Sequence, residues 1–381
     1  MIGTFKCPRC GNYKERYIGY KNGQPYCRFC ISLKGESAKE YIPKGGLTII
    51  DLKYKLSDEQ EKISTEVTEN YKKGIDTLIN AVCGAGKTEL VYKVIAYALS
   101  NRKTVGFAIP RRDVVIELFP RIKSAFPHNS VVMVYGGNTN ALTADIVLLT
   151  THQLYRYENF FDLLIIDEID AFPYKNNLLL EKMFTRSLRG RSVMMSATPS
   201  KETLNYYSKK GRAILELNTR FHHKPLPVPI VKVRPGMTKI PYLIKKLREF
   251  ISQCKPVFVF APTIETCEEI YSIISKFIPK GMFVHSRNPN REIIIESFKN
   301  GKYMYLITTA VLERGVTIKN LQVIIYEADH RIYDEQALVQ IAGRVGRKYD
   351  APEGEVIFLV TKETKDIRSA INSIKKRNTY L

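Results

Sequence analysis

The sequence predicts an α/β fold with two parallel-sheet domains, preceded by a small four-cysteine module. From about Leu47 onward, short apolar runs alternate with longer segments of helical periodicity. Continuous apolar strands separated by helices are typical of a parallel sheet that is covered on both faces. A proline-rich pause divides the runs into two series, and four cysteines lie within the first thirty residues.

The two series of apolar runs define the expected domains. The first comprises 77–82, 105–109, 146–149, 163–166 and 193–195, and the second comprises 256–260, 282–285, 303–307, 323–327 and 356–360. Residues 220–239 between them contain four prolines and few helix formers, so we expect a semi-rigid linker there. The predicted boundaries are 1–45 for the four-cysteine module, 46–222 for the first domain and 223–381 for the second.

The charge of the chain favours a polyanionic partner. The 381 residues carry a formal net charge of +21. Such a charge favours nucleic acid or an anionic membrane surface, and fast, salt-sensitive association. A solvated, lysine-rich surface is the alternative explanation of the same charge.

Cysteine usage and the lack of long apolar segments bear on the location. The seven cysteines do not read as the disulfide framework of a secreted protein, which favours a reducing, intracellular environment. No apolar run approaches the ~18–20 residues that span a bilayer, and the first residues lack the pattern of a signal peptide. We therefore expect a soluble, cytoplasmic protein.

The clustered cysteines predict a zinc site. Cys7 and Cys10 form one C-x₂-C knuckle, and Cys27 and Cys30 form a second one sixteen residues later. Tetrahedral zinc takes four soft ligands, and four thiolates leave no open position for catalysis. We expect a structural Zn²⁺ that supplies the folding energy of a module with little core. Basic and tyrosine side chains around the knuckles suit single-stranded nucleic acid, and a protein-docking surface explains them nearly as well.

A phosphate-binding loop is predicted at residues 81–88, which follow a strand and open a helix. The candidate nucleotide-binding residues of this loop are Gly84, Ala85, Gly86, Lys87 and Thr88. The glycines would let backbone N–H groups close around phosphates. The lysine would neutralise the β- and γ-phosphates, and the threonine would ligate Mg²⁺. Ala81 stands where the general pattern has its first glycine, so a chance Gly-Lys-Thr at a helix start is the alternative.

An acidic pair at the end of another strand supports the nucleotide site. The apolar run 163–166 leads into Asp167 and Glu168, and ligands bind at the carboxyl ends of the strands in α/β sheets. Asp167 would hold Mg²⁺, and Glu168 would orient and deprotonate the attacking water. Carboxylates at a strand end also serve as ordinary helix caps, which is the structural alternative.

Two arginines in the second domain complete the predicted catalytic set. Arg344 and Arg347 are three residues apart, which would place them on one side of a helical turn. Planar guanidinium groups suit the charge that spreads over a transferring phosphoryl group. We expect ATP held between the two domains to favour a closed arrangement that hydrolysis releases, which is the physical basis of a motor.

Together these elements resemble superfamily 2 helicases of the DEAD/DEAH-like group, whose motifs occur in order from residue 53 to residue 360. The resemblance implies two RecA-like domains, with ATP and Mg²⁺ as cofactors. It implies that Gln60 reads adenine and that Gly315 of motif V lies in the nucleotide site. It also implies that Ser196 and Thr198 of motif III, with Gln340 of motif VI, couple ATP to the nucleic acid.

The same resemblance implies which residues face the nucleic acid. In this group, motifs Ia, Ib, IV and V line the bound strand. The corresponding residues here are Pro110, Arg111, Arg112, Thr151, His152, Gln153, Thr263 and Thr309.

A four-cysteine unit directly before a compact helicase core resembles the ComFA family, cytoplasmic ATPases that help pull transforming single-stranded DNA into bacteria. Residues 167–174, Asp-Glu-Ile-Asp-Ala-Phe-Pro-Tyr, are similar to that family's extended motif II. The resemblance implies single-stranded DNA as the substrate and a peripheral position at the inner face of the cell membrane. The implied partners are a membrane DNA-uptake channel, a DNA-processing protein and a phosphoribosyltransferase-like competence protein. The oligomeric state stays open.

Two other functions are compatible with parts of this pattern. A PriA-like replication-restart helicase, or another superfamily 2 DNA or RNA helicase, uses the same core, although the restart helicase carries its zinc cysteines within its second domain. A zinc-ribbon DNA-binding scaffold with weak ATPase activity is the third hypothesis. A scaffold of this kind would have lost most of its ATPase activity. The sequence argues against that loss, because it keeps Lys87, Glu168, Arg344 and Arg347.

Overall fold

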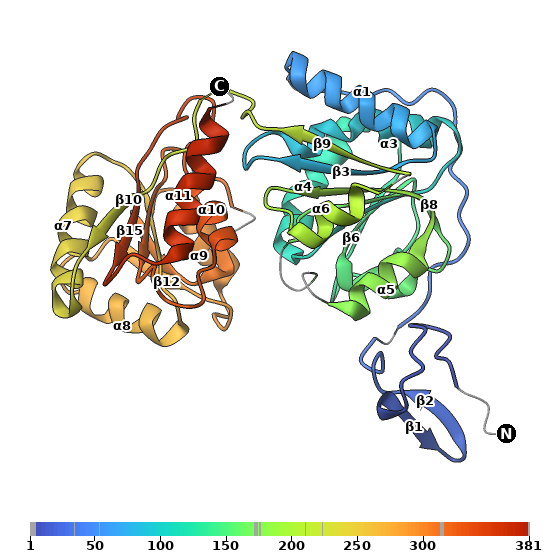
Figure 1. The fold of residues 1–381 in the computed structure, drawn as a ribbon, viewed down its shortest axis with the longest axis horizontal. Coiled ribbons are helices and arrows are strands. Elements are labelled where there is room, and N and C mark those ends of the chain that lie inside the picture. Colours follow the sequence, from blue (N-terminus) through green and yellow to red (C-terminus); the bar gives the residue numbers. More distant parts are fainter. Residues whose placement is uncertain are drawn as a thin grey trace. The chain divides into compact units, whose positions relative to one another are not determined.

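The structure is a computed structural model that describes residues 5–33, 35–52, 54–170, 174, 177–209, 211–222, 224–312 and 316–379, without the side chain of Val311. The chain folds into two units, drawn in Figure 1. The first comprises Met1–Ala81 and Gly86–Leu217, and the second comprises Val82–Ala85 and Asn218–Leu381. Each unit is built on a parallel sheet, which confirms the predicted fold class.

The sheet of the first unit has seven strands in the order β5-β6-β4-β7-β8-β3-β9, and all its described pairings are parallel. Its strands are β3 (Asp76–Ala81), β4 (Val105–Ile109), β5 (Val131–Val134), β6 (Ile146–Thr150), β7 (Phe161–Ile166), β8 (Leu188–Ser196) and β9 (Arg212–Leu217). The central strands β4, β6 and β7 are buried at every residue. Burial on both faces explains why their sequences are continuous apolar runs.

The helices of the first unit connect these strands. They are α1 (Asp58–Lys72), α2 (Lys87–Leu90), α3 (Tyr92–Ser100), α4 (Arg112–Ala125), the 3₁₀ helix η2 (Thr151–Arg156), α5 (Leu178–Ser187) and α6 (Lys201–Tyr207). Since the strands are parallel, β3, β4, β6, β7 and β8 all end at one edge of the sheet. The candidate motifs that follow these strands therefore lie along one edge, where α/β sheets bind ligands.

The four-cysteine module belongs to the first unit. Its elements are η1 (Glu15–Tyr17) and a hairpin of β1 (Ile18–Lys21) and β2 (Gln24–Cys27). Asn22 and Gly23 connect the two strands with φ of 48° and 75°, the left-handed pair that suits a two-residue hairpin turn. The four cysteines and Leu33 are buried in one hydrophobic cluster with side chains of η2 and α5.

The second unit has a six-stranded sheet in the order β10-β15-β14-β11-β13-β12, again with parallel pairings. Its strands are β10 (Ile230–Val233), β11 (Val257–Phe260), β12 (Gly281–Val284), β13 (Tyr305–Thr308), β14 (Gln322–Tyr326) and β15 (Val356–Val360). Its helices are η3 (Gly236–Thr238), α7 (Lys239–Ser252), α8 (Ile264–Ile274), α9 (Arg291–Lys299), η4 (Ala310–Leu312), α10 (Glu335–Ala342) and α11 (Lys365–Asn378).

Alternate residues of β11 show how the second sheet is covered. Val257 and Val259 lie in one core cluster with side chains of α7 and α8. Phe258 stacks instead on Phe298 of α9, with ring centroids 5.2 Å apart. Because successive strand side chains point to opposite faces, helices cover this sheet on both sides.

The expected linker at 220–239 is only partly a linker. It contains β10, which pairs in parallel with β15 and extends the second sheet at its edge. The prolines of this stretch precede or follow β10 rather than interrupt it. Proline is compatible with such an edge strand because it removes no donor from the ladder interior.

Candidate active site and metal centre

The predicted phosphate-binding loop connects β3 to α2. Gly84 has φ of 83°, and Gly86, the N-cap residue directly before α2, has φ of 75°. These left-handed conformations are accessible to glycine at little cost. Lys87 and Thr88 are the first two residues of α2. The loop therefore has the strand–loop–helix context that a phosphate-binding loop requires.

Gln60 reaches this loop from α1. Its Oε1 accepts a hydrogen bond from the Ser57 N–H at 2.9 Å, and its own N–H donates to Ser57 Oγ at 3.3 Å. This capping box begins α1 and buries the glutamine side chain. A Cβ placed on Gly86 would come within 2.6 Å of Gln60 Nε2. The structure thus brings the predicted adenine-reading residue against the phosphate-binding loop.

The acidic pair lies directly after β7. Asp167 Oδ1 accepts a hydrogen bond from the Glu168 N–H at 2.8 Å, and the Asp167 N–H donates to the Ala108 carbonyl of β4 at 3.1 Å. Glu168 has φ of 58°, a conformation that is uncommon for residues other than glycine and is concentrated at functional sites. These backbone contacts and the φ of Glu168 therefore fix the positions of both residues at the carboxyl end of β7.

Asp170 joins the acidic segment to motif III. Its Oδ1 accepts a hydrogen bond from Ser196 Oγ at 2.7 Å, and its Oδ2 accepts one from Thr198 Oγ1 at 2.8 Å. Ser196 Oγ in turn accepts from the Thr198 N–H at 3.0 Å. Two of the three residues predicted to couple ATP to the nucleic acid, Ser196 and Thr198, are thus joined to the acidic segment. Sequence reasoning did not select Asp170, although it is the fourth residue of the Asp-Glu-Ile-Asp motif.

The predicted nucleic-acid residues of the first unit follow β4 and β6. Pro110 and Arg111 separate β4 from α4, and Arg112 begins α4 with its guanidinium 5.0 Å from the ring centroid of Tyr135. In η2, His152 is exposed, whereas Thr151 and Gln153 are buried. Of these three residues, His152 alone offers an exposed side chain to a bound strand, and the contacts of motif Ib stay a prediction. Gln153 Oε1 accepts a hydrogen bond from Arg156 Nε at 2.6 Å.

In the second unit, the predicted residues occupy helix starts and strand ends. Thr263 caps the start of α8, and its Oγ1 accepts a hydrogen bond from the Thr266 N–H at 3.1 Å. Thr309 follows β13 directly. Gln340 is buried in α10. Gly315 lies outside the described residues.

The two candidate arginine fingers differ from the prediction. Arg344 and Arg347 do not share a helical turn, because α10 ends at Ala342 and Gly346 adopts φ of 67°. Arg344 is buried and donates from Nη1 to the Val316 carbonyl at 2.8 Å. Arg347 is partly exposed and donates from Nε to the Gly343 carbonyl at 2.9 Å. The C-cap of α10 is Gly343, so the helix has already ended before either arginine.

Arg220 holds this turn and was missed by sequence reasoning. The buried guanidinium donates to the carbonyls of Val345 at 2.7 Å and of Gly346 at 3.0 Å. Burial, with the nearby charge of Arg347, lowers the pKa of Arg220 to about 10. An arginine in a proline-rich stretch carries no local signal of this contact, which spans more than a hundred residues of sequence.

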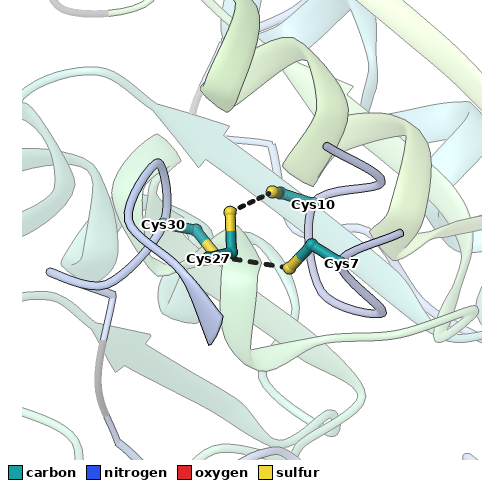
Figure 2. A group of neighbouring side chains, drawn as sticks. All are labelled: Cys7, Cys10, Cys27 and Cys30. Atoms are coloured by element: carbon teal, nitrogen blue, oxygen red, sulfur yellow. Dashed lines mark hydrogen bonds between the residues drawn. The ribbon is translucent and has the colours of Figure 1, made fainter. Parts of the chain in front are cut away.

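The four cysteines of the module converge on one point (Figure 2). Their sulfur atoms all lie within 4.8 Å of one another, and the pairs Cys7/Cys30 and Cys10/Cys27 are 3.6 Å apart. Zinc–sulfur bonds of about 2.3 Å in a tetrahedron place sulfur atoms about 3.8 Å apart. The residues therefore fit a four-thiolate zinc centre.

The environment of these thiols opposes ionisation at two of them. Burial raises the pKa of Cys10 to about 11 and raises that of Cys30 further. Burial acts in the same direction at Cys7, but hydrogen bonds from the backbone N–H groups of Cys10 and Arg9 lower the pKa of Cys7 overall. A cation such as Zn²⁺ would stabilise the thiolates and displace their protons.

Two family models match the chain. Residues 53–201 match the model described as type III restriction enzyme, res subunit, and residues 239–349 match the helicase conserved C-terminal domain. The competence protein ComFA of Bacillus subtilis (strain 168) is 34% identical, with 98% of this chain and 86% of that protein covered. The competence protein ComFA of Streptococcus pneumoniae is 33% identical, with 99% and 91% covered.

Solved structures share the fold. S. cerevisiae Dbp5 bound to RNA and ADP BeF3 matches with a TM-score of 0.63 at 15% identity, over 86% of this chain and 92% of that chain. RecG bound to a three-way DNA junction matches with a TM-score of 0.59 at 20% identity, over 88% of this chain and 48% of that chain.

Proposed function

Because the chain belongs to the ComFA family of superfamily 2 helicases, we propose that it is an ATP-driven motor that moves along single-stranded DNA during DNA uptake. The observation that carries the proposal is the shared edge of the first sheet. There the candidate ATP residues after β3 and β7 lie on the same side as the motifs after β4 and β6. Hydrolysis at one part of this edge can therefore change the contacts of another part.

The residues after β3 and β7 fit Mg²⁺ and ATP. Positive φ at Gly84 and Gly86 opens the loop to phosphates, and Lys87 would neutralise their charge. Bound Mg²⁺ would offset the charge that develops on the phosphates. Thr88 and Asp167 would hold that ion, since hydroxyl and carboxylate oxygens are its preferred protein ligands. Glu168 would take the proton of the attacking water.

Asp170 offers a route from hydrolysis to the nucleic acid. Its carboxylate accepts hydrogen bonds from Ser196 and Thr198, the residues at and after the end of β8. Asp167 and Glu168 precede it in the same short segment. If this segment shifts when the γ-phosphate is lost, Ser196 and Thr198 of motif III would move with it, because both donate hydrogen bonds to the Asp170 carboxylate. Hydrogen bonds to an ionised carboxylate are stronger than those between neutral groups.

The charge of the chain supports a nucleic-acid substrate. A net charge of +21 favours phosphate contacts, and Arg111, Arg112 and the exposed His152 lie at the edge described above. The ComFA relatives are named as competence proteins, which supports single-stranded DNA rather than RNA as the substrate.

The same relationship supports a place in the DNA-uptake machinery. Among the described residues, no helix is both long and apolar enough to cross a membrane. We place the protein in the cytoplasm, at the inner face of the membrane. A DNA-uptake channel, a DNA-processing protein and a phosphoribosyltransferase-like competence protein are the proposed partners.

Nucleic-acid dependence of the ATPase rate tests this function. The rate of the purified 381-residue chain is measured with single-stranded DNA, duplex DNA and RNA of matched length, at about 50 and about 200 mM salt. We expect a several-fold rise with single-stranded DNA that weakens at the higher salt, because phosphate contacts release counterions. The Lys87→Ala protein is the hydrolysis-deficient control.

The other outcomes separate the alternatives. An equal rise with RNA, or with duplex DNA alone, would contradict the DNA-uptake function and favour a general or restart helicase. A rate that no nucleic acid changes would contradict the motor altogether and leave a DNA-binding scaffold.

A further inference from the structure

We propose that Arg156 is a positioning residue that joins the four-cysteine module to η2, so that the metal-bound shape of the module sets how η2 meets single-stranded DNA. The inference rests on the proposed function, because it takes η2 as part of the DNA-binding edge. Arg156 is the last residue of η2 and is 8% exposed.

One guanidinium group bridges the module and the motif. Arg156 Nε donates to Gln153 Oε1 at 2.6 Å, and its Nη1 donates to the Glu36 carbonyl at 2.7 Å. A backbone hydrogen bond also joins the module to η2, since the Ala38 N–H donates to the Arg156 carbonyl at 2.8 Å. The donors of a planar guanidinium have a fixed relative geometry, so a displacement of residues 36–38 is passed to Gln153.

The segment at Glu36 follows the second cysteine knuckle closely. The Leu33 N–H donates to the Cys30 carbonyl at 3.1 Å. The Leu33 carbonyl accepts a hydrogen bond from Nη1 of Arg9, which lies between the two cysteines of the first knuckle. Both knuckles are therefore connected to the start of the segment that Arg156 holds.

Tyr155 receives a second contact from the module. The Arg9 guanidinium lies 5.9 Å from the Tyr155 ring centroid, and that of Arg156 lies 4.9 Å from it. Both distances are within the range of a cation–π interaction. Because Arg9 is part of the first knuckle, loss of the metal would loosen this contact together with the hydrogen bonds to Arg156.

The guanidinium of Arg156 occupies the space that a side chain at Gly35 would fill. The φ of Gly35 is 139°, which side chains rarely adopt, and a Cβ there would lie 2.5 Å from both Nη1 and Nη2 of Arg156. Any larger residue at 35 would push the guanidinium away from Glu36. The contact can thus be disturbed from either side, at Arg156 or at Gly35.

The other side of η2 is held independently of the module. Arg186 of α5 donates from Nη1 to the carbonyls of Tyr155 at 3.1 Å and Tyr157 at 3.0 Å. Disturbing Arg156 is therefore expected to move η2 without unfolding it. The nucleotide residues follow β3 and β7, so the ATP site keeps its geometry.

The first test separates DNA binding from ATP binding. In Arg156→Gln and in Gly35→Ala, the concentration of single-stranded DNA that half-activates the ATPase should rise roughly tenfold. A change of this size corresponds to the loss of one hydrogen bond to a charged group. The ATP KM without DNA should stay unchanged. Gly23→Ala is the matched control, because Gly23 also has positive φ, at 75°, but no atom within 4 Å of an added Cβ. Arg248→Gln, at an exposed position of α7, controls for the lost charge.

Salt dependence distinguishes positioning from direct contact. If Arg156 acts only through η2, the slope of log affinity against log salt stays as in the wild type. A slope reduced by about 1 would mean that Arg156 itself contacts a phosphate, and this result would overturn the proposal. A half-activating DNA concentration that is unchanged in both variants would overturn it as well.

Amide hydrogen exchange tests the connection between the module and η2 without DNA. Chelating the zinc should speed exchange in peptides covering 36–41 and 150–158 of the wild type. In Arg156→Gln, exchange at 150–158 should already be fast and should no longer respond to chelation. Exchange at 150–158 that ignores chelation in the wild type would overturn the connection. If instead the wild type binds no single-stranded DNA, the proposed function fails while hydrogen exchange still decides the role of Arg156.

Discussion

Glu168→Gln is expected to slow ATP hydrolysis by about 10²–10⁴-fold, the usual contribution of a general base. The amide cannot accept the proton of the attacking water, while its size and shape remain similar to those of the carboxylate. The backbone conformation at this position, with φ of 58°, and the hydrogen bond from its N–H to Asp167 do not depend on the carboxylate. ATP binding should therefore be retained.

Two measurements check this expectation. Single-turnover hydrolysis gives the chemical rate, and fluorescence of a labelled ATP analogue gives the binding constant. Glu181→Gln in the first turn of α5 is the matched control, and it should hydrolyse at the wild-type rate. Turnover retained in Glu168→Gln would show that another group activates the water.

Cys10→Ser should remove the metal and most of the folding free energy of the module. Metal binding contributes about 10–16 kcal/mol in small zinc modules, which is as large as the whole stability of an ordinary domain, about 5–15 kcal/mol. Cys10 is buried among the other three cysteines, so a serine there leaves three thiols without the fourth soft ligand. Most residues of the hydrophobic cluster that holds the cysteines come from the seven-stranded sheet and its helices, so the remainder of the first unit should stay folded.

Zinc content and limited proteolysis measure this loss. The wild type should hold about one zinc ion per chain, and its affinity should fall as the pH falls. The sign follows from the pKa of Cys10, which burial raises to about 11, because metal binding must displace a proton that low pH retains. Cys254→Ser, at an exposed cysteine of the second unit, is the control. Unchanged zinc content in Cys10→Ser would contradict the four-thiolate centre.

The fold could be predicted because burial leaves a local signature. Strands covered on both faces need apolar side chains at every position, so the runs at 105–109 and 356–360 coincide with β4 and β15. β10 was not predicted because it is a short edge strand in a proline-rich stretch and its residues are only partly buried or exposed. Such a strand depends on its partner β15, which is far away in sequence.

The candidate site was predictable where one motif carries the chemistry. The phosphate-binding loop, the acidic pair and the cysteine knuckles are each contained in a few consecutive residues. Asp170, Arg156 and Arg220 were missed because their partners lie far from them in sequence, as with Arg156 and Glu36. Contacts between residues far apart in the chain leave no periodic pattern in the amino-acid sequence, so they cannot be predicted from it. The segment with the two arginines differs from the expected helix because α10 ends at Ala342 and Gly346, between the arginines, has a left-handed φ.

Displacement of streptavidin from a biotinylated end of single-stranded DNA tests the motor most directly. The protein is incubated with ATP and an oligonucleotide that carries streptavidin at either its 5′ or its 3′ end. We expect ATP-dependent displacement from one end only, and none with Glu168→Gln. ATP hydrolysis that single-stranded DNA stimulates, without displacement from either end, would contradict movement along the strand.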